Sequence, residues 1–112
     1  MSSERAAPDS PPAAADWSLY VVRTRGGELY TGIARDVGRR LAEHEAGRGA
    51  KCLRGRGPLE LAYRVAVGER GLALRLEQRL KRLDRAAKQA LVDAAPDREA
   101  LIARLDAPAT AR

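Results

Sequence analysis

The first regular pattern along the chain is a pair of short hydrophobic runs on either side of a glycine-rich turn. The runs 19–22 and 29–33 are rich in β-branched and aromatic residues, which favour extended strands. Between them, Gly26 and Gly27 supply the positive φ angles that a tight hairpin turn requires. The pattern therefore predicts an antiparallel β-hairpin, with ordered structure beginning near Trp17.

A helical pattern and a strand pattern follow the hairpin. Asp36 is a typical N-cap residue, and we expect a helix from there to about Ala46, with Val37 and Leu41 facing inward. Apolar residues then alternate with polar or small ones over 59–67, which is the period of a strand. We expect this third strand to bury one of its faces.

Helices are predicted for the rest of the chain. Leucines recur at helical spacing over 72–83, Asp84 is a candidate cap for a helix to about Val92, and Pro96 and Asp97 open another. The order of two strands, a helix, a strand and further helices predicts an α+β fold. Its sheet is small, three-stranded and antiparallel, and helices flank it.

The length of 112 residues fits one compact domain between two tails. We expect a disordered N-terminal tail over 1–16, because that segment has Pro, Ser and Ala without apolar periodicity. The folded domain is expected over 17–94, and a C-terminal helix and tail over 95–112. The chain shows neither a signal-peptide layout nor a run of ~18 apolar residues, so we expect a cytoplasmic protein without a membrane partner.

The net charge of +6 is concentrated in the middle of the chain, with +5 over 17–57 and +3 over 58–83. A positive field of this kind attracts polyanions, of which nucleic acid is the commonest. The alternative explanation is compositional, since eighteen Arg against three Lys is typical of GC-rich coding.

One segment carries unopposed positive charge. Residues 46–58 contain four Gly, four basic residues and no acid, which is typical of a mobile basic loop. We expect the basic residues of this loop and of the preceding helix to contact nucleic acid: Arg39, Arg48, Lys51, Arg54 and Arg56.

Few side chains of this protein are able to do chemistry, because it has one His, three Tyr, one Cys and no Phe. One sulfur and one imidazole are too few for a four-ligand zinc site, so any metal would be a hard cation bound through oxygen. Arg40 and His44 are separated by one helical turn and lie on one face of the predicted helix.

The segments Ser18-Leu19-Tyr20 and Tyr30-Thr31-Gly32 have Arg40, His44 and Glu77 after them in the order and spacing of a known family. The chain thereby resembles the GIY-YIG nucleases over about 17–92, and specifically their small stand-alone bacterial branch. The chain departs from the family pattern at two positions, where Ser18 and Leu19 replace the Gly and Ile that name the family. A third is Cys52, which stands where close relatives have an aromatic residue and offers no ring for base stacking.

The resemblance implies a metal-dependent endonuclease that hydrolyses DNA phosphodiester bonds with little sequence preference, in DNA repair or recombination. Glu77 would hold Mg²⁺ or Mn²⁺, and Arg40 would bind the scissile phosphate. Tyr20 or Tyr30 would be the general base, and His44 would take the phenol proton or bind the phosphate. Gly32 would shape the second motif. The expected partner is DNA, bound by a monomer or weak dimer without a small-molecule cofactor. Branched, nicked or damaged DNA is one option, and duplex DNA, single-stranded DNA and RNA are the alternatives.

Simpler explanations exist for each of these residues. The two tyrosines could pack a core that lacks Phe, and Glu77 could form an exposed helical ion pair with Lys81. His44 could be a surface residue at the end of its helix, and Arg39 and Arg40 could both be solvated. Two other functions would also fit the charge: a DNA-binding module of the same fold that does not cut, and a structural protein of the ribosome or nucleoid.

Overall fold

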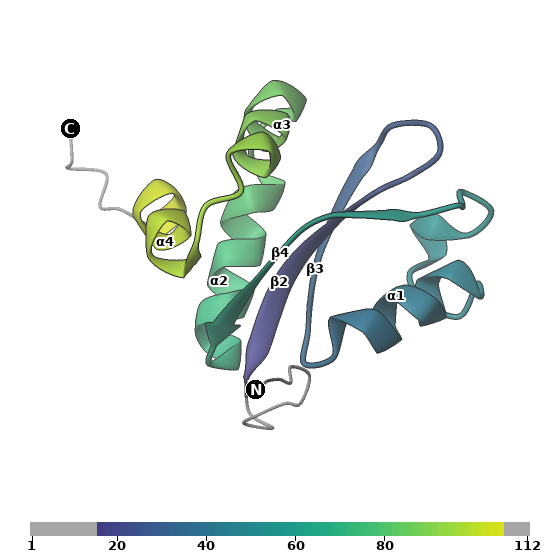
Figure 1. The fold of residues 1–112 in the computed structure, drawn as a ribbon, viewed down its shortest axis with the longest axis horizontal. Helices are drawn as coiled ribbons and strands as arrows, with labels where there is room; N and C mark the ends of the chain where they lie inside the picture. The colour runs from purple at the N-terminus through teal and green to yellow at the C-terminus, as the bar shows by residue number, and fades with distance from the viewer. Residues whose placement is uncertain (1–15, 107–112) are drawn as a thin grey trace, which may run out of the picture.

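The computed structural model describes residues 16–106, so all but one residue of the predicted N-terminal tail and the last six residues lie outside it. Figure 1 shows the described elements as one sheet flanked by helices, which confirms the predicted α+β fold. In chain order the elements are β2 (Trp17–Arg23), β3 (Leu29–Ala34), α1 (Val37–Glu45), the short 3₁₀ helix η2 (Lys51–Leu53), β4 (Glu60–Gly68), α2 (Arg70–Lys81), α3 (Arg85–Ala94) and α4 (Arg98–Asp106).

The sheet has the order β3-β2-β4, and β2 pairs antiparallel with both neighbours. In the register, Tyr20 lies opposite Gly32 on β3 and Arg64 on β4. Helix α1 lies on one side of the sheet, and α2 lies on the other side together with α3 and α4 (Figure 1). The first two strands form the predicted hairpin.

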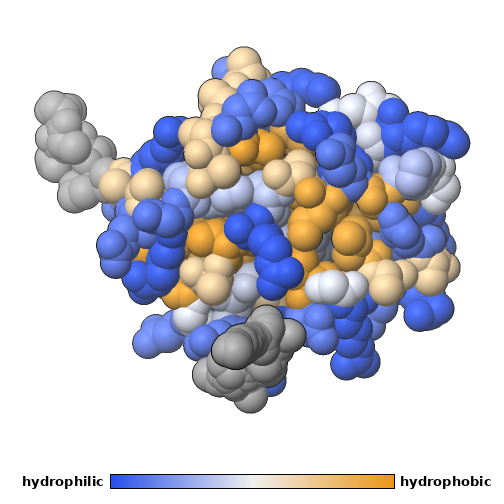
Figure 2. Space-filling view, viewed as in Figure 1, coloured by the Kyte–Doolittle hydropathy of each residue, from blue (hydrophilic) through white to orange (hydrophobic). Residues whose placement is uncertain are grey.

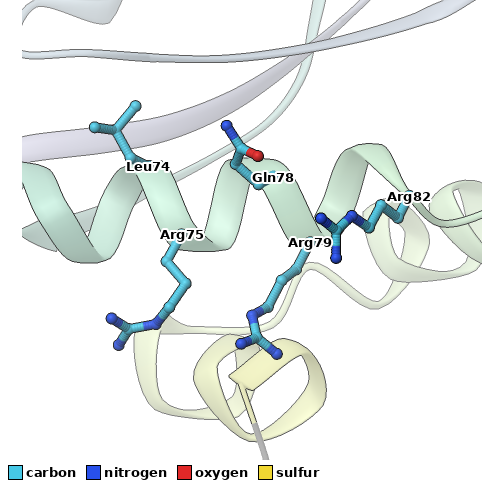
Figure 3. Close-up of a pocket in the computed structure, with 5 residues that line it drawn as sticks. All are labelled: Leu74, Arg75, Gln78, Arg79 and Arg82. Atoms are coloured by element: carbon cyan, nitrogen blue, oxygen red, sulfur yellow. The ribbon is translucent and has the colours of Figure 1, made fainter.

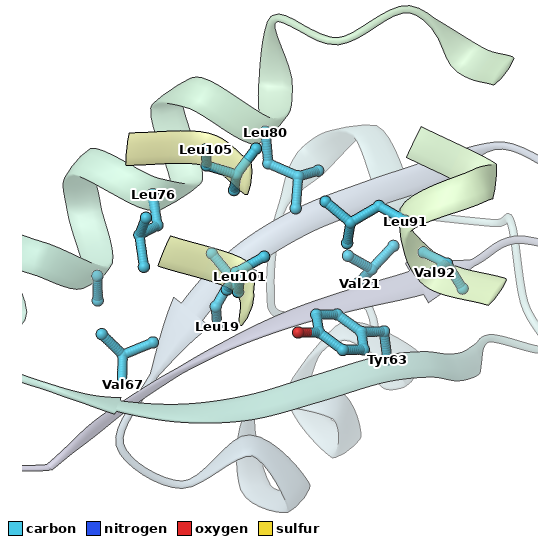
Figure 4. Packing of buried hydrophobic residues seen from close by; sticks show 11 residues of the cluster. Leu19, Val21, Tyr63, Val67, Leu76, Leu80, Leu91, Val92, Leu101 and Leu105 are labelled. Carbon is cyan, nitrogen blue, oxygen red and sulfur yellow. The ribbon is translucent and has the colours of Figure 1, made fainter. Parts of the chain in front are cut away.

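Side chains of β2 alternate between two hydrophobic cores. Leu19 and Val21 belong to the larger core, which α2, α3 and α4 cover and which Figure 4 shows from close by. Tyr20 and Val22 belong to the smaller core, which lies under α1 and the loop after it. The central strand is therefore buried on both faces.

Strand β4 does not bury only one face, as its alternating sequence had predicted. A register shift at Ala62 places Tyr63 opposite Val21 but Leu61 opposite Val22. This bulge moves the alternation to the other face, so Leu61 packs against the smaller core while Tyr63 and Val65 pack in the larger one. The prediction of a single buried face was wrong, because pairing with β2 determines the register.

The helix caps follow the sequence. The carboxylates of Asp36, Asp84 and Asp97 each accept a hydrogen bond from the backbone N–H three residues later, at 2.8–3.0 Å. Gly47, just after α1, has a φ of +82°, in the left-handed region that ends many helices.

In the view of Figure 2, polar residues cover most of the outline and apolar residues are visible between them. Among the described helices, none has the length and hydropathy needed to cross a membrane.

Candidate active site

A buried hydrogen-bonded chain joins the central strand to helix α1. The hydroxyl of Tyr20, on β2, lies 2.9 Å from Nε2 of His44, in the last turn of α1. The backbone N–H of Ala50 donates to the other ring nitrogen, Nδ1, at 3.1 Å. Both residues are only 2% exposed, so His44 is not the solvated surface residue of the simpler explanation.

These contacts determine the tautomer of His44. A backbone N–H can only donate, so Nδ1 must carry the lone pair, and the proton of the neutral ring must be on Nε2. Burial, with a smaller effect of the Arg40 charge, lowers the pKa of His44 and favours this neutral form. His44 therefore donates to the Tyr20 hydroxyl. It has no free lone pair for the phenol proton, which makes the first of its two predicted roles incompatible with this geometry.

Two glycines make room for this chain. A Cβ on Gly32 would lie 2.5 Å from the hydroxyl oxygen of Tyr20, since the two residues are cross-strand partners and the ring covers Gly32. A Cβ on Gly49 would overlap Nδ1 of His44. Each site requires glycine because a ring occupies the space where a side chain would begin.

Tyr30, on the edge strand β3, connects the buried chain to helix α2. Its ring meets the ring of His44 edge-on, with centroids 5.5 Å apart. The ammonium of Lys81 lies 6.0 Å from the centroid of the Tyr30 ring and also pairs with the Glu77 carboxylate at 3.2 Å. The predicted Glu77–Lys81 ion pair is present, but the side chain of Glu77 is only 13% exposed and lies beside the predicted site.

The residues at this position fit a hard divalent cation. Glu77 supplies a carboxylate, and residues 16–106 contain no cluster of three or more His, Cys, Asp or Glu that could form an all-protein metal cage. Magnesium is commonly held by one or two carboxylates, with water and substrate phosphate as its other ligands. A single half-buried carboxylate near the phenols of Tyr20 and Tyr30 is consistent with that donor set.

Arg40 is oriented by a neighbouring acid. Its Nη1 donates to Oε1 of Glu43 at 2.9 Å, while Nε of Arg39 lies 3.5 Å from the other oxygen of the same carboxylate. The guanidinium of Arg40 is close enough to Tyr20 to lower the pKa of that phenol. The Arg39 side chain is 77% exposed. Arg40 therefore lies at the site, and Arg39 lies toward solvent.

The two phenols are both protonated at neutral pH in this state. Burial, and then the neighbouring Tyr30, raise the pKa of Tyr20 to about 12, and the nearby Arg40 lowers it by less. Burial also raises the pKa of Tyr30, against the charge of Lys81. A phenolate at this site therefore needs additional positive charge.

The basic loop is more structured than its composition had predicted. It contains η2, and Leu53 within η2 is 3% exposed in the smaller core. Arg56 is paired with Glu28 of the hairpin at 2.9 Å, so the absence of acids within the loop does not leave it unpaired. Arg48, Lys51 and Arg54 are exposed and form no ion pair within residues 16–106.

A cavity of about 350 Å³ lies elsewhere, on the outer side of α2 (Figure 3). No predicted site residue lines it. Arg75 and Arg79 point from α2 toward α4, where both pair with Asp106 at 2.9 and 3.4 Å. These contacts attach α4 to α2, which indicates a structural role for the arginines of this cavity.

Comparison with known proteins assigns the family. The sequence-family model described as the GIY-YIG catalytic domain matches residues 16–90 of this chain. The chain belongs to the GIY-YIG family. Membership implies nuclease-type activity, and the predicted site residues all lie within the matched range.

Proteins of similar length match most of this chain. A UPF0213 protein of Citrobacter koseri is 52% identical over 92 residues, which cover 82% of this chain and 92% of that protein. UPF0213 protein YhbQ of Salmonella typhimurium is 49% identical with the same coverage of both chains. The solution NMR structure of UPF0213 protein BH0048 from Bacillus halodurans is 38% identical, with a TM-score of 0.48. The match covers 70% of this chain and 84% of that one.

Sequence reasoning missed several residues around the GIY-YIG site. Gly49 and Ala50 hold the His44 ring from the loop, yet they were counted only as part of a basic segment. Glu43 orients Arg40 and received no role. The i, i+3 spacing of Glu43 after Arg40 could have indicated their pairing. No sequence signal indicated that Ala50 uses its backbone N–H.

Proposed function

We propose that this protein is a metal-dependent endonuclease that hydrolyses DNA phosphodiester bonds with little intrinsic sequence preference. The observation that carries the proposal is the buried Tyr20–His44–Ala50 chain beside Arg40. Packing alone does not require a buried histidine of defined tautomer to donate to a phenol beside a guanidinium. Phosphodiester hydrolysis requires both a proton acceptor and anion stabilisation.

In this proposal Tyr20 is the general base. Its hydroxyl oxygen accepts from Nε2 of His44, and this hydrogen bond stabilises the phenolate more than the phenol. Tyr30 has no such donor among the described residues, although it packs against the same imidazole. Tyr20 would take the proton of the attacking water, and Tyr30 would shape the site and keep Lys81 in place.

Arg40 and Glu77 would handle the phosphate. The fork of Arg40 donates to the nonbridging oxygens, and Glu43 holds that guanidinium in position from its other side. Glu77 would hold Mg²⁺ or Mn²⁺, which when bound stabilises the leaving alkoxide and favours the Tyr20 phenolate. Lys81, now 3.2 Å from Glu77, would exchange that carboxylate for phosphate contact.

The test is an incubation of the purified protein with labelled linear, nicked and branched DNA, in the presence of Mg²⁺, Mn²⁺ or EDTA. Metal-dependent cleavage of at least one substrate supports the proposal. Binding without cleavage on every substrate, in both metals, would instead favour a DNA-binding module that keeps the fold but does not cut.

A further inference from the structure

The tip of the β2–β3 hairpin and the loop that carries η2 meet at a second concave surface. A cavity of about 250 Å³ opens there, and we call it the tip cavity. No candidate catalytic residue lines it. Its lining consists of three arginines, two glycines and one acid: Arg25, Arg54, Arg56, Gly26, Gly55 and Glu28.

Hydrogen bonds hold the two walls of the tip cavity together. The backbone N–H of Arg25, on the hairpin tip, donates to the carbonyl of Arg56 at 3.0 Å. Within the hairpin, the N–H of Thr24 donates to the carbonyl of Glu28 at 2.9 Å. On the loop side, Arg56 N–H donates to the carbonyl of Leu53, which is anchored in the smaller core. The cavity is therefore preformed, which lowers the entropy cost of binding.

The charges around the tip cavity do not cancel. Arg56 donates to the Glu28 carboxylate at 2.9 Å, so these two residues neutralise each other and fix the wall. Arg25 and Arg54 are exposed, and neither pairs with an acid among residues 16–106. Two like charges thus flank one cavity, and an anion placed between them would remove their repulsion.

We propose that the tip cavity binds one backbone phosphate of DNA between Arg25 and Arg54, with Arg56 as the residue that positions the two walls. The inference rests on the proposed function in taking DNA as the ligand. A guanidinium fork matches the oxygens of a phosphate, and phosphate contacts set the orientation of a protein on DNA. The hairpin tip and the η2 loop would thus bind the DNA strand at a phosphate other than the scissile one.

The test compares DNA binding by Arg25→Gln, Arg54→Gln and the double variant, measured in EDTA so that no cleavage occurs. Each single variant is expected to weaken binding at low salt on the order of fivefold. Because the two arginines share one phosphate, the fold-loss of DNA affinity in the double variant should be smaller than the product of the fold-losses in the two single variants. Its slope of log affinity against log salt should fall in magnitude by about 0.9 on duplex DNA.

A matched control is Arg104→Gln, which removes the same charge from an exposed position on α4, across the sheet. This variant should retain wild-type affinity and salt slope. An equal loss in Arg104→Gln would show a general charge effect and overturn the site. A double variant with wild-type slope, or with fully multiplicative losses, would overturn the sharing of one phosphate.

A second arm identifies the source of the phosphate by NMR of the arginine Nε–H signals. Addition of a short DNA duplex should shift the signals of Arg25 and Arg54 and leave that of Arg104 unchanged. Shifts with inorganic phosphate but none with DNA would overturn the proposal, since the cavity would then be a site for a free anion.

These results are distinguishable from failure of the proposed function. If the protein binds DNA with the expected slope changes but cuts no substrate, the nuclease proposal fails and the phosphate site stands. If it cuts DNA and the double variant binds as wild type, only the tip cavity assignment fails. Thermal unfolding of both single variants should match wild type, which excludes misfolding as the cause of weaker binding.

Discussion

The two faces of the sheet share the central strand β2 but differ in the side chains that they bury. On the face under α2, α3 and α4, eleven buried residues form the larger core, and its only side-chain hydroxyl, that of Tyr63, donates to the carbonyl of Pro96. On the face under α1, six residues form the smaller core. Tyr20 is one of them, and the buried His44 lies beside it.

The difference separates a mainly aliphatic core from a face that holds buried polar groups, within one small domain. Burial of aliphatic side chains stabilises the fold without any need for polar partners. A buried imidazole and phenol must instead be hydrogen-bonded, and they specify glycine at nearby backbone positions. The larger core therefore permits the smaller face to carry polar groups that would otherwise destabilise it.

The strongest test of this separation is Glu77→Gln, on the helix that contacts both regions. Cleavage should fall on the order of 10³-fold, because loss of metal-assisted charge stabilisation is worth several kcal/mol. DNA affinity in EDTA should stay near wild type or rise slightly, since one negative charge is lost. Gel-based cleavage and fluorescence anisotropy measure the two effects. Glu99→Gln, whose side chain is 86% exposed on α4, is the control. Wild-type cleavage by Glu77→Gln would refute its assignment.

Two phenols on opposite faces sharpen the comparison. Tyr20→Phe should reduce the cleavage rate about 100-fold, because the general base is lost. Tyr63→Phe should leave cleavage unchanged. Both variants leave a buried partner unsatisfied, the Nε2–H of His44 in one and the Pro96 carbonyl in the other. Each should therefore lose about 1–3 kcal/mol of unfolding free energy, measured by urea denaturation. Similar rates in the two variants would contradict a catalytic role for Tyr20.

A pair of glycines tests whether His44 must be held in place. In Gly49→Ala, the added methyl group would overlap the His44 ring and displace it. The hydrogen bond from His44 to the Tyr20 hydroxyl is then lost, and cleavage should fall about tenfold, the equivalent of one charge-assisted hydrogen bond. Gly71→Ala, in α2, meets nothing within 4 Å and should raise stability by about 0.5–1 kcal/mol with no change in rate. If Gly49→Ala cleaves as fast as Gly71→Ala, the position of the imidazole is unimportant.

The smallest expected effect is a dependence of stability on pH. Folding lowers the pKa of His44, through burial and then Arg40, with Glu43 opposing them. In the unfolded chain, His44 has its ordinary pKa of about 6.5 and binds a proton below that pH. In the folded chain it does not, so the free energy of unfolding should fall as pH drops through about 6.5.

Thermal midpoints between pH 7.5 and 5.5 measure this effect, and His44→Gln should flatten the profile in that window. The carboxylates with lowered pKa, such as Glu43 and Asp106, lose their contribution only at lower pH, below about 4.5. Parallel profiles for wild type and His44→Gln would show that His44 titrates normally and is not a buried neutral donor.

The sequence by itself determined the elements and their order. Caps at Asp36, Asp84 and Asp97 and the glycine-rich turn gave boundaries close to those observed, because these signals are local and act within one or two turns of backbone. The candidate site residues were predicted from spacing and resemblance, and the structure places Tyr20 beside His44 and Arg40.

Only the tertiary structure decided which groups meet across long distances in the chain. The bulge at Ala62 assigns the two halves of β4 to different cores, Glu28 neutralises Arg56, and the N–H of Ala50 fixes the His44 tautomer. Each depends on how separate segments dock, since register, ion pairs and backbone donors between them have no local sequence signature. For that reason, the sequence indicated the chemistry of the site but not the direction of the hydrogen bond between His44 and Tyr20.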